Sequence, residues 1–575
     1  MEKTLPVPRL AAAALAVSLV APLLATPARA ADPADQLLEI QKQISALQAE
    51  LARVKRDLAA QNAKQRAAAE EIEKQRAATA ELEKQRAAQA KAVPVVAPAV
   101  QVPPGYMLVP AANAPTTPDT LTTAQAAPWA TPEQPKLGKG QFQVGGMTIT
   151  LGGFIELSGF YRSRNEVADI PTAWATIPLS NLPQAHQGEF RATARQTRLN
   201  LLASGNIDAA QTLAAFVETD FLSAAPTANS VESNSYNPRL RQAYVQYDNS
   251  DWGLHVLAGQ AWTLLTPFKI GITPRQENIP LTIDHQQVPG SIWARQPQLR
   301  VAKDFDDHKL WIAGSVEGPQ TTFSTPTSTT TFNGQTITTT LPGGNFFAPN
   351  VLYSDNILPD FIAKVAYDPG WGHYEAYGVL RLMNDRVSFP GGGHNNYSTA
   401  GGGGANMILP LIPGKLDFQA SVLAGAGIGR YGTSLLADAT VGPSGQVVPL
   451  PEVQALIGLV GHPIPSVDLY SYVGTEQVQS RSWTVNHINF GYGNPNFSNA
   501  GCAIELSPLP CTGNTSGVTQ GTVGAWWRFY QGNYGTVQAG AQYSYTRRNI
   551  FRGIGGAPFA DENIVMLSLR YFPFQ

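Results

Sequence analysis

The sequence predicts an all-β fold: a transmembrane antiparallel β-barrel of about sixteen strands, preceded by an α-helical coiled coil and a proline-rich linker. Three observations lead to this prediction. Apolar and polar residues alternate through much of residues 141–575, which is the period of a half-buried strand. Short turns and long polar loops follow one another along that region. The chain begins with an export signal and then offers no apolar stretch of about eighteen residues, so only strands could cross a membrane.

Residues 1–30 have the features of a secretory signal peptide. A basic start runs into the apolar stretch 10–24, and the sequence Ala-Arg-Ala at 28–30 offers a site for cleavage between Ala30 and Ala31. A retained anchor helix is the alternative, but the apolar stretch is short for one. We therefore expect an exported protein, and the strand pattern described below places it in the bacterial outer membrane.

Residues 31–92 are predicted to form a coiled coil in the periplasm. Apolar residues recur three and four apart over three heptads, with a positions Leu37, Ile44, Leu51 and Leu58 and d positions Ile40, Leu47 and Val54. Leucine at a with β-branched residues at d favours three or four helices over two. A single amphipathic helix packed on a globular domain is the alternative.

Residues 93–140 are predicted to be an extended linker. They contain ten prolines, including Pro103 and Pro104. Proline interrupts both helices and sheet ladders, so this stretch separates two folded units and belongs to neither.

Residues 141–575 carry the pattern of the barrel. The stretch 151–164 is typical: one face holds Leu151, Gly153, Ile155, Leu157, Gly159 and Tyr161, and the other holds Glu156, Ser158, Phe160, Arg162 and Arg164. Seven short turns, near residues 205, 248, 303, 368, 412, 461 and 531, alternate with long loops, which gives sixteen strands with both ends on one side. In a soluble sheet, nothing would be expected to place the short turns at one edge and the long loops at the other. The stretch 453–461 could instead be helical, and the glycine runs at 391 and 401 are predicted to be unstructured loop.

A barrel of about sixteen strands leaves a water-filled lumen, so the architecture predicts a channel. The segment 263–292 is a candidate for a loop that folds into this lumen. From Gln141 onward the chain has nineteen arginines and five lysines. The guanidinium fork matches a carboxylate, so arginines on the inner face would favour anions.

Alternation and loop position give a set of candidate pore-lining residues. The basic members are Arg162, Arg164, Arg198, Arg295, Arg300, Arg381 and Arg528, and the acidic members are Glu156, Glu218 and Asp220. The alternative is that these groups pair with one another and leave a neutral lining. Carboxylates outnumber basic residues in this region by 29 to 24, so the pore as a whole is not expected to be positive.

The two cysteines, Cys502 and Cys511, are expected to form a loop-closing disulfide in an oxidising compartment. A metal pair is a weak alternative, because no histidine lies nearby. The histidines have no metal-ligand spacing and no catalytic motif is evident, so we expect no cofactor and no enzymatic activity. A net charge of −2 argues against nucleic acid as a partner.

Four pieces of the sequence, in order, resemble the DcaP-like family of trimeric outer-membrane porins. They are "RQTRLNL" at 195–201, "PRLRQAYVQY" at 238–247, "LAGQAW" at 257–262 and "IPLTIDHQQVPGSIWARQPQLRVA" at 279–302. The resemblance implies a homotrimer of sixteen-stranded barrels in outer-membrane lipids, a periplasmic coiled coil, and uptake of small anionic solutes such as dicarboxylates. Two alternatives are a non-selective or neutral-solute porin and a structural tether whose coiled coil contacts the cell wall.

Overall fold

The computed structural model describes residues 137–222, 236–324, 356–485 and 487–575, the backbone of the strands at 327–332, 335–340 and 353–354, and Gln48. The predicted signal peptide, the predicted coiled coil apart from Gln48, and most of the predicted linker lie outside these described residues. Within the described part of the chain, no helix is long and apolar enough to cross a membrane.

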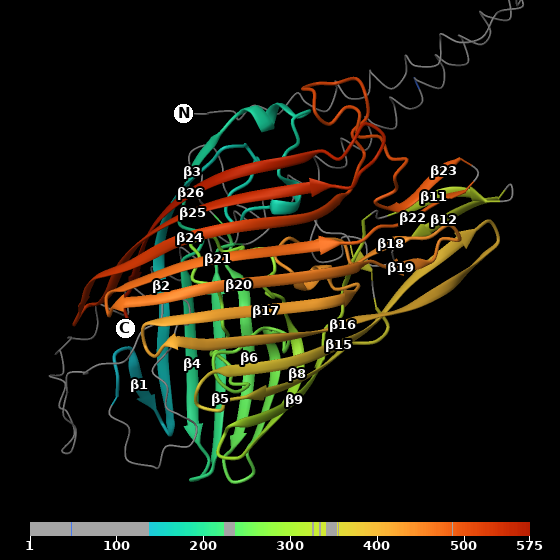
Figure 1. Ribbon diagram of the computed structural model, residues 1–575. Coiled ribbons are helices and arrows are strands. Elements are labelled where there is room, and N and C mark those ends of the chain that lie inside the picture. The colour runs from blue at the N-terminus through green and yellow to red at the C-terminus, as the bar shows by residue number, and fades with distance from the viewer. Residues whose placement is uncertain are drawn as a thin grey trace, which may run out of the picture. The chain divides into compact units, whose positions relative to one another are not determined.

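Sixteen strands form a closed antiparallel barrel (Figure 1), as predicted. Each strand pairs with the next in chain order, and the ring closes where β26 pairs with β2, from Ile155↔Tyr571 to Arg162↔Ile564. The wall strands are β2 (Met147–Arg162), β4 (Arg198–Asn206), β5 (Gln211–Asp220), β6 (Arg239–Asn249), β7 (Leu254–Trp262), β8 (Arg295–Phe305), β9 (Leu310–Glu317), β14 (Asp360–Tyr367), β15 (His373–Phe389), β16 (Gly392–Ile412), β17 (Leu416–Ala426), β20 (Pro451–Ile464), β21 (Val467–Val478), β24 (Thr515–Gly532), β25 (Gly535–Ile550) and β26 (Phe559–Phe572).

Shorter elements extend the wall or lie in the loops. The first, β1, forms a hairpin with the start of β2, and β3 pairs with its end. The hairpin of β11 and β12 continues the wall beside β15. The short strands are β1 (Gln141–Val144), β3 (Glu189–Thr193), β10 (Thr321–Thr322), β11 (Thr327–Phe332), β12 (Gln335–Thr340), β13 (Tyr353–Ser354), β18 (Ala439–Val441), β19 (Val447–Pro449), β22 (Arg481–Val485) and β23 (Ile488–Tyr492), and the 3₁₀ turns are η1 (Trp174–Thr176), η2 (Pro183–His186) and η3 (Gly429–Tyr431).

The predicted sorting of connections is confirmed. The seven short turns follow β4, β6, β8, β14, β16, β20 and β24, and all lie on one rim. The start of β2 and the end of β26 belong to this same rim, because Thr148 pairs with Ser204 and Phe572 with Thr536. Most connections on the other rim are long, although β15 and β16 join there through a tight turn.

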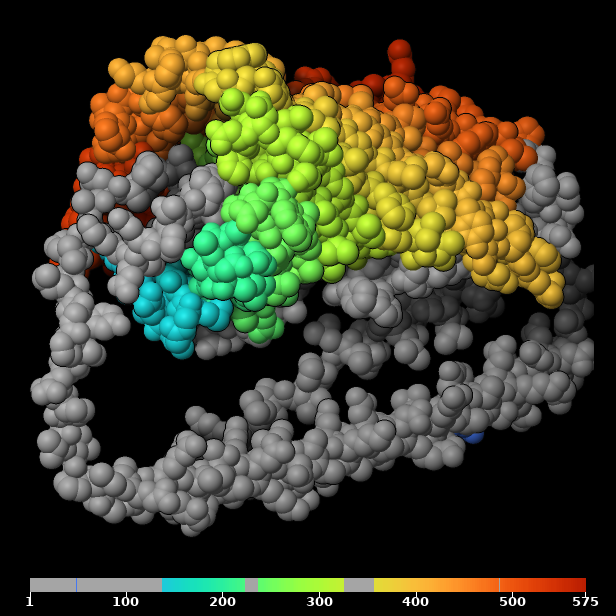
Figure 2. Space-filling view, turned by 90° about the horizontal axis from the view of Figure 1, so that it is seen from below, coloured from blue at the N-terminus to red at the C-terminus, as the bar shows by residue number. Residues whose placement is uncertain are grey.

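Side chains of the wall alternate between an apolar outer face and a polar inner face. In β26, Val565, Leu567 and Leu569 are exposed, whereas Ser568 and Arg570 are buried. Figure 2 shows part of this wall as a continuous surface whose colours run from green through yellow to orange. A closed barrel has no open sheet edge, and an apolar exterior suits a lipid environment. Other exposed apolar wall residues include Ile155, Leu157, Leu199, Val217, Val245, Leu299, Val301, Ile312, Val316, Phe361, Val365, Ile457, Leu469, Val473 and Val523.

One local prediction needs correction. Apart from Gly391, which lies in the turn before β16, the glycine runs at 391 and 401 are part of strand β16 and are not loop. A side chain at Gly404 would collide with the ring of Tyr377 and the carbonyl of Val422, so glycine makes room for an inward aromatic ring. The stretch 453–461 belongs to strand β20, as the sixteen-strand prediction requires, and the helical alternative is wrong. Val453, Ile457 and Leu459 face outward with the period of two.

Residues 263–294, which we call the inner segment, run between β7 and β8 and fold into the barrel. Leu264, Phe268 and Ile283 are completely buried. The backbone N–H of Phe268 donates to Glu375 on β15 at 2.9 Å. The N–H of Ile283 donates to Gln542 on β25 at 2.6 Å. These strands lie on widely separated parts of the ring, so the inner segment crosses the lumen.

Candidate functional site

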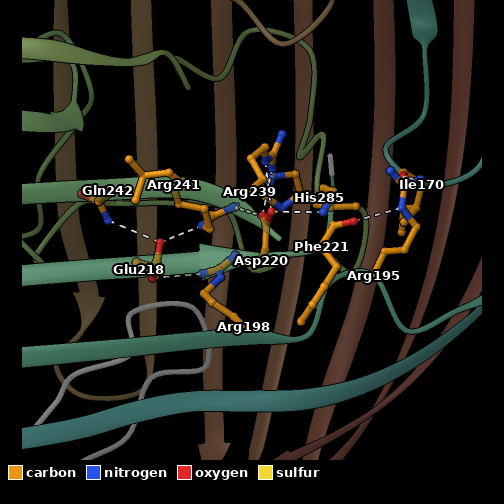
Figure 3. Close-up of polar contacts among 12 residues, drawn as sticks. Ile170, Arg195, Arg198, Glu218, Asp220, Phe221, Arg239, Arg241, Gln242 and His285 are labelled. Carbon is orange, nitrogen blue, oxygen red and sulfur yellow. Dashed lines mark hydrogen bonds and ion pairs between the residues drawn. The ribbon is translucent and has the colours of Figure 1, made fainter. Parts of the chain in front are cut away.

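An ion-paired cluster on β5 and β6 faces the inner segment (Figure 3). Asp220 Oδ2 accepts hydrogen bonds from Arg239 Nη2 at 2.8 Å and from Arg241 Nη1 at 2.7 Å. Arg241 Nε also donates to Glu218 Oε1 at 2.6 Å. Such charge-assisted bonds fix the planar guanidinium of Arg241 between the two carboxylates. The cluster is thus a rigid, charged part of the inner wall.

A β-bulge explains why Arg241 faces inward. The pairing of β5 with β6 shifts register between Glu218↔Gln242 and Thr219↔Leu240, which leaves Arg241 as the extra residue. Consecutive side chains normally alternate, but both Arg241 and Gln242 are buried on the inner side. A bulge re-aims a side chain in this way, and bulges are enriched beside functional sites.

His285 of the inner segment completes the cluster. Its Nε2 lies 3.4 Å from Arg239 Nη2 and 3.2 Å from Arg241 Nη1. An arginine N–H can only donate, so Nε2 accepts and the imidazole is neutral with its proton on Nδ1. Burial, followed by the charge of Arg241, lowers the pKa of His285 well below its usual range. The histidine therefore serves as an acceptor that ties the inner segment to the wall.

A cavity of about 60 Å³ lies between this wall and the inner segment. Two aromatic rings, those of Phe216 and Trp262, border it alongside charged groups and carboxamides. Its lining consists of Gln196, Arg198, Phe216, Glu218, Arg241, Gln242, Trp262, Arg275, Glu277, Ile279, Pro280, Thr282, Asp284, His285, Gln287 and Arg570.

The charged lining contains four arginines and three carboxylates. Arg275 Nη1 donates to Tyr244 Oη at 2.9 Å and to Gln246 Oε1 at 3.2 Å, so neutral acceptors hold it. Burial raises the pKa of Glu277 on the inner segment, so this carboxyl loses its proton less readily than an exposed glutamate does. The net charge of the residues that line the cavity is therefore slightly positive, although the net charge of the barrel region as a whole is not.

Several of the residues predicted from the sequence lie at or beside this cavity. Arg198 lies 4.0 Å from Glu218, and both line it. Glu156 accepts a hydrogen bond from the lining residue Arg570 at 2.8 Å. Asp220 belongs to the ion-paired cluster described above. Two further predicted arginines stand near its edge: the guanidinium of Arg295 lies 4.6 Å from the ring of Trp262, and Arg300 donates to Gln298 at 2.9 Å.

The other predicted arginines lie away from the cavity, each held by its own acceptors. Arg162 donates to Glu189 at 2.9 Å, and Arg164 Nε donates to the carbonyl of Asp561 at 2.6 Å. These two fix the loop that follows β2. Arg381 pairs with Asp360 at 3.2 Å and with Asp438 at 3.1 Å. Arg528 pairs with Asp468 at 2.9 Å near the short-turn rim.

The charged residues and the histidine that the sequence analysis missed are Arg239, Arg241, Arg275, Glu277, Asp284, His285 and Arg570. Alternation alone could have predicted one of them. Leu567, Leu569 and Tyr571 face outward, so Arg570 must face inward. The bulge conceals Arg241, because strict alternation places it on the lipid side. Arg275, Glu277 and His285 lie on the inner segment, which has no period from which a direction could be read.

The predicted disulfide joins Cys502 and Cys511. It closes a loop at the rim opposite the short turns, and that loop packs on the connection between β2 and β3. Asn181 N donates to the carbonyl of Cys502 at 3.1 Å, and Leu506 N donates to the carbonyl of Asn181 at 3.0 Å. The disulfide therefore supports two outer loops and lies outside the cavity.

No protein-family model matches the chain, and no curated protein matches it. Among solved structures, the outer membrane channel DcaP of Acinetobacter baumannii matches with a TM-score of 0.53 and 17% identity, over 76% of this chain and 99% of that chain. An anion-selective porin from Comamonas acidovorans gives a TM-score of 0.40 and 9% identity, over 74% and 99%. The first match shows a shared fold and agrees with the resemblance seen in the sequence.

Proposed function

We propose that this protein is a passive diffusion channel of the bacterial outer membrane, a porin for small hydrophilic solutes that prefers small anions such as dicarboxylates. The observation that carries the proposal is the cavity beside the inner segment, which four arginines line inside a closed barrel. The outer-membrane location rests on the apolar exterior of the barrel and on the export signal.

The preference for anions follows from the charge of the cavity lining beside the inner segment. A solute that passes the inner segment meets Arg198, Arg275 and Arg570, whereas burial weakens the acidity of Glu277. Arg295 offers a buried Nη1 without a hydrogen-bond partner among the described residues. An anion with two carboxylates could engage two guanidiniums at once. The resemblance to the DcaP-like family points to the same class of solute.

The proposal includes a homotrimer, which the heptad at 37–58 and the family resemblance support. The start of β2 lies on the short-turn rim, which faces the periplasm in outer-membrane barrels, so the coiled coil would hang below the membrane. From there it could also contact the cell wall, which keeps a structural tether as the second candidate function. Deletion of residues 35–91 tests it: a tether predicts altered envelope spacing with channel activity retained.

Reconstitution in planar lipid bilayers tests the proposed function. The purified protein should give stepwise conductance in potassium chloride and a reversal potential that shows preference for chloride. The absence of any conductance from correctly folded protein would refute the channel. Conductance with cation preference would refute the anion preference alone.

A further inference from the structure

Two glutamates, Glu166 and Glu562, meet at the rim opposite the short turns. Glu562 lies near the start of β26, and Glu166 lies in the connection from β2 to β3; these three strands run side by side (Figure 1). The carboxyl groups of the two residues lie within hydrogen-bonding range of each other. Glu562 is completely buried, so this contact brings two acidic groups together away from bulk water.

Backbone hydrogen bonds hold the two glutamates next to each other. Glu166 Oε2 accepts from Ala173 N at 2.9 Å, which fixes the Glu166 side chain within its own connection. Arg164 Nε donates to the carbonyl of Asp561, the residue before Glu562, at 2.6 Å. The connection is thus tied to the start of β26, although the two carboxylates would repel each other when both are ionised.

Several oxygen atoms at this place have no donor. Both carboxylate oxygens of Glu562 and Oε1 of Glu166 lack a hydrogen-bond partner among the described residues. The side-chain oxygen of Gln184 is also buried without a partner there, and the backbone carbonyl of Gln184 accepts from Asn165 N, beside Glu166, at 2.9 Å. A buried acceptor without a donor is unfavourable, above all when it is charged. The arrangement therefore calls for a positively charged partner.

The neighbouring arginines do not supply that partner. Arg162 is the basic group that acts most strongly on both glutamates, but its Nη1 donates to Glu189 at 2.9 Å. Arg548 donates to the carbonyl of Ile177 at 2.7 Å. The carboxylate of Asp284 adds further negative charge near Glu166. The pair of glutamates is thus left without a bonded counter-charge in the described part of the chain.

We propose that Glu166 and Glu562 bind a calcium ion at the outer rim, with Gln184 Oε1 as a neutral ligand. Calcium takes carboxylate, carboxamide and water oxygens in a flexible geometry, whereas magnesium demands a near-ideal octahedron. No group of three or more acidic, histidine or cysteine residues suited to a metal occurs among the described residues, so water would complete the coordination. We therefore expect a Kd of about 10⁻⁴–10⁻³ M, as in extracellular calcium modules. The site would tie the connection after β2 to β26, and it goes beyond the proposed channel without depending on its selectivity.

Terbium luminescence tests the site in the purified full-length protein. Tb³⁺ takes the same oxygen ligands as Ca²⁺, and it emits when a nearby tryptophan transfers its excitation. Trp174 is buried and directly follows Ala173, whose N–H bonds to Glu166. Excitation of tryptophan should therefore give terbium emission that millimolar calcium displaces, and Trp174→Phe should lower this emission several-fold. Glu166→Gln and Glu562→Gln should each abolish it.

Glu505→Gln is the matched control, because it removes a half-exposed carboxylate of the disulfide loop and should keep the full emission. Limited proteolysis of the wild type gives a second measurement that needs no variant: calcium should slow cleavage within residues 163–188 several-fold relative to a chelator. Two results would overturn the proposal: no calcium-displaced emission from the wild type at neutral pH, or equal cleavage with calcium and with the chelator. Both are expected if the two carboxyl groups share a proton instead. Neither measurement requires conductance, so failure of the calcium site is distinct from failure of the channel.

Discussion

Arg570 Nε lies 2.8 Å from Glu156 Oε2, across the line where the last strand of the barrel meets the first. The hydroxyls of Ser158 and Ser568 both donate to the other carboxylate oxygen at 2.6 Å. Arg570 also lines the cavity beside the inner segment. One arginine therefore takes part both in closing the barrel and in setting the charge of the lumen.

Arg570→Gln should destabilise the barrel by about 3–5 kcal/mol, because it leaves Glu156 buried without its counter-charge. The double variant Glu156→Gln/Arg570→Gln should recover part of this loss, since a neutral pair replaces the ion pair. Urea unfolding in detergent micelles, followed by tryptophan fluorescence, measures both. A single variant as stable as the wild type would show that the pair does not hold the closure.

Phe268→Ala should loosen the inner segment and raise single-channel conductance. The Phe268 ring is completely buried, and Lys364 Nζ lies 4.8 Å from its centre. Truncating a buried phenylalanine costs about 3–5 kcal/mol, enough to weaken the docking of one segment while the wall stays paired. Phe190→Ala on β3 is the matched control, because Phe190 is 74% exposed on the outer face. The same conductance from both variants would argue against a narrowing role for the inner segment.

The anion preference should fall as the pH rises, because Glu277 titrates above the usual range of a glutamate. Its protonated form adds no charge to the cavity, and its ionisation at higher pH adds a negative charge beside the arginines. Reversal potentials measured at several pH values from 5 to 9 should show this decline, and Glu277→Gln should abolish it. Glu505→Gln, on the exposed disulfide loop, should leave the decline intact. A decline that persists in Glu277→Gln would assign it to another group.

Replacing both Cys502 and Cys511 by serine should free the outer loops without unfolding the barrel. A disulfide that closes so short a loop contributes about 2–3 kcal/mol. The loss falls on the disulfide loop and on its partner around Asn181, since the wall strands pair independently of it. Limited proteolysis should cut the loop at 163–188 sooner than in the wild type, at an unchanged thermal midpoint of the barrel. A lower thermal midpoint of the barrel with loops that stay uncut would contradict a role of the disulfide in the outer loops alone.

The sequence predicted the wall well because a membrane barrel must present lipid and water to alternate residues. That constraint placed Arg198, Glu218 and Asp220 on the inner face, where the structure has them. The loop prediction for the glycine runs of β16 was wrong, because it rested on composition alone. These glycines belong to a strand, where the ring of Tyr377 leaves no room for a side chain at Gly404.

The centre of the candidate site could not be predicted, because it depends on contacts between distant parts of the chain. The position of Ile283 is fixed by Gln542, and that of Leu281 by Trp526, whose Nε1 donates to its carbonyl at 2.8 Å. No local pattern encodes such pairings. The inward turn of Arg241 likewise depends on one extra residue in β6, which alternation by itself cannot reveal.

The reversal potential across a planar bilayer in a potassium chloride gradient tests the central claim most directly. The wild-type protein should prefer chloride, and Arg198→Gln/Arg275→Gln should lower the ratio of chloride to potassium permeability several-fold by removing two of the four cavity arginines. Arg386→Gln is the control, since it removes one exposed charge on β15 away from the cavity and should leave the ratio unchanged. An unchanged ratio in the double variant, or cation preference in the wild type, would contradict the assignment of this cavity as the anion-selective site.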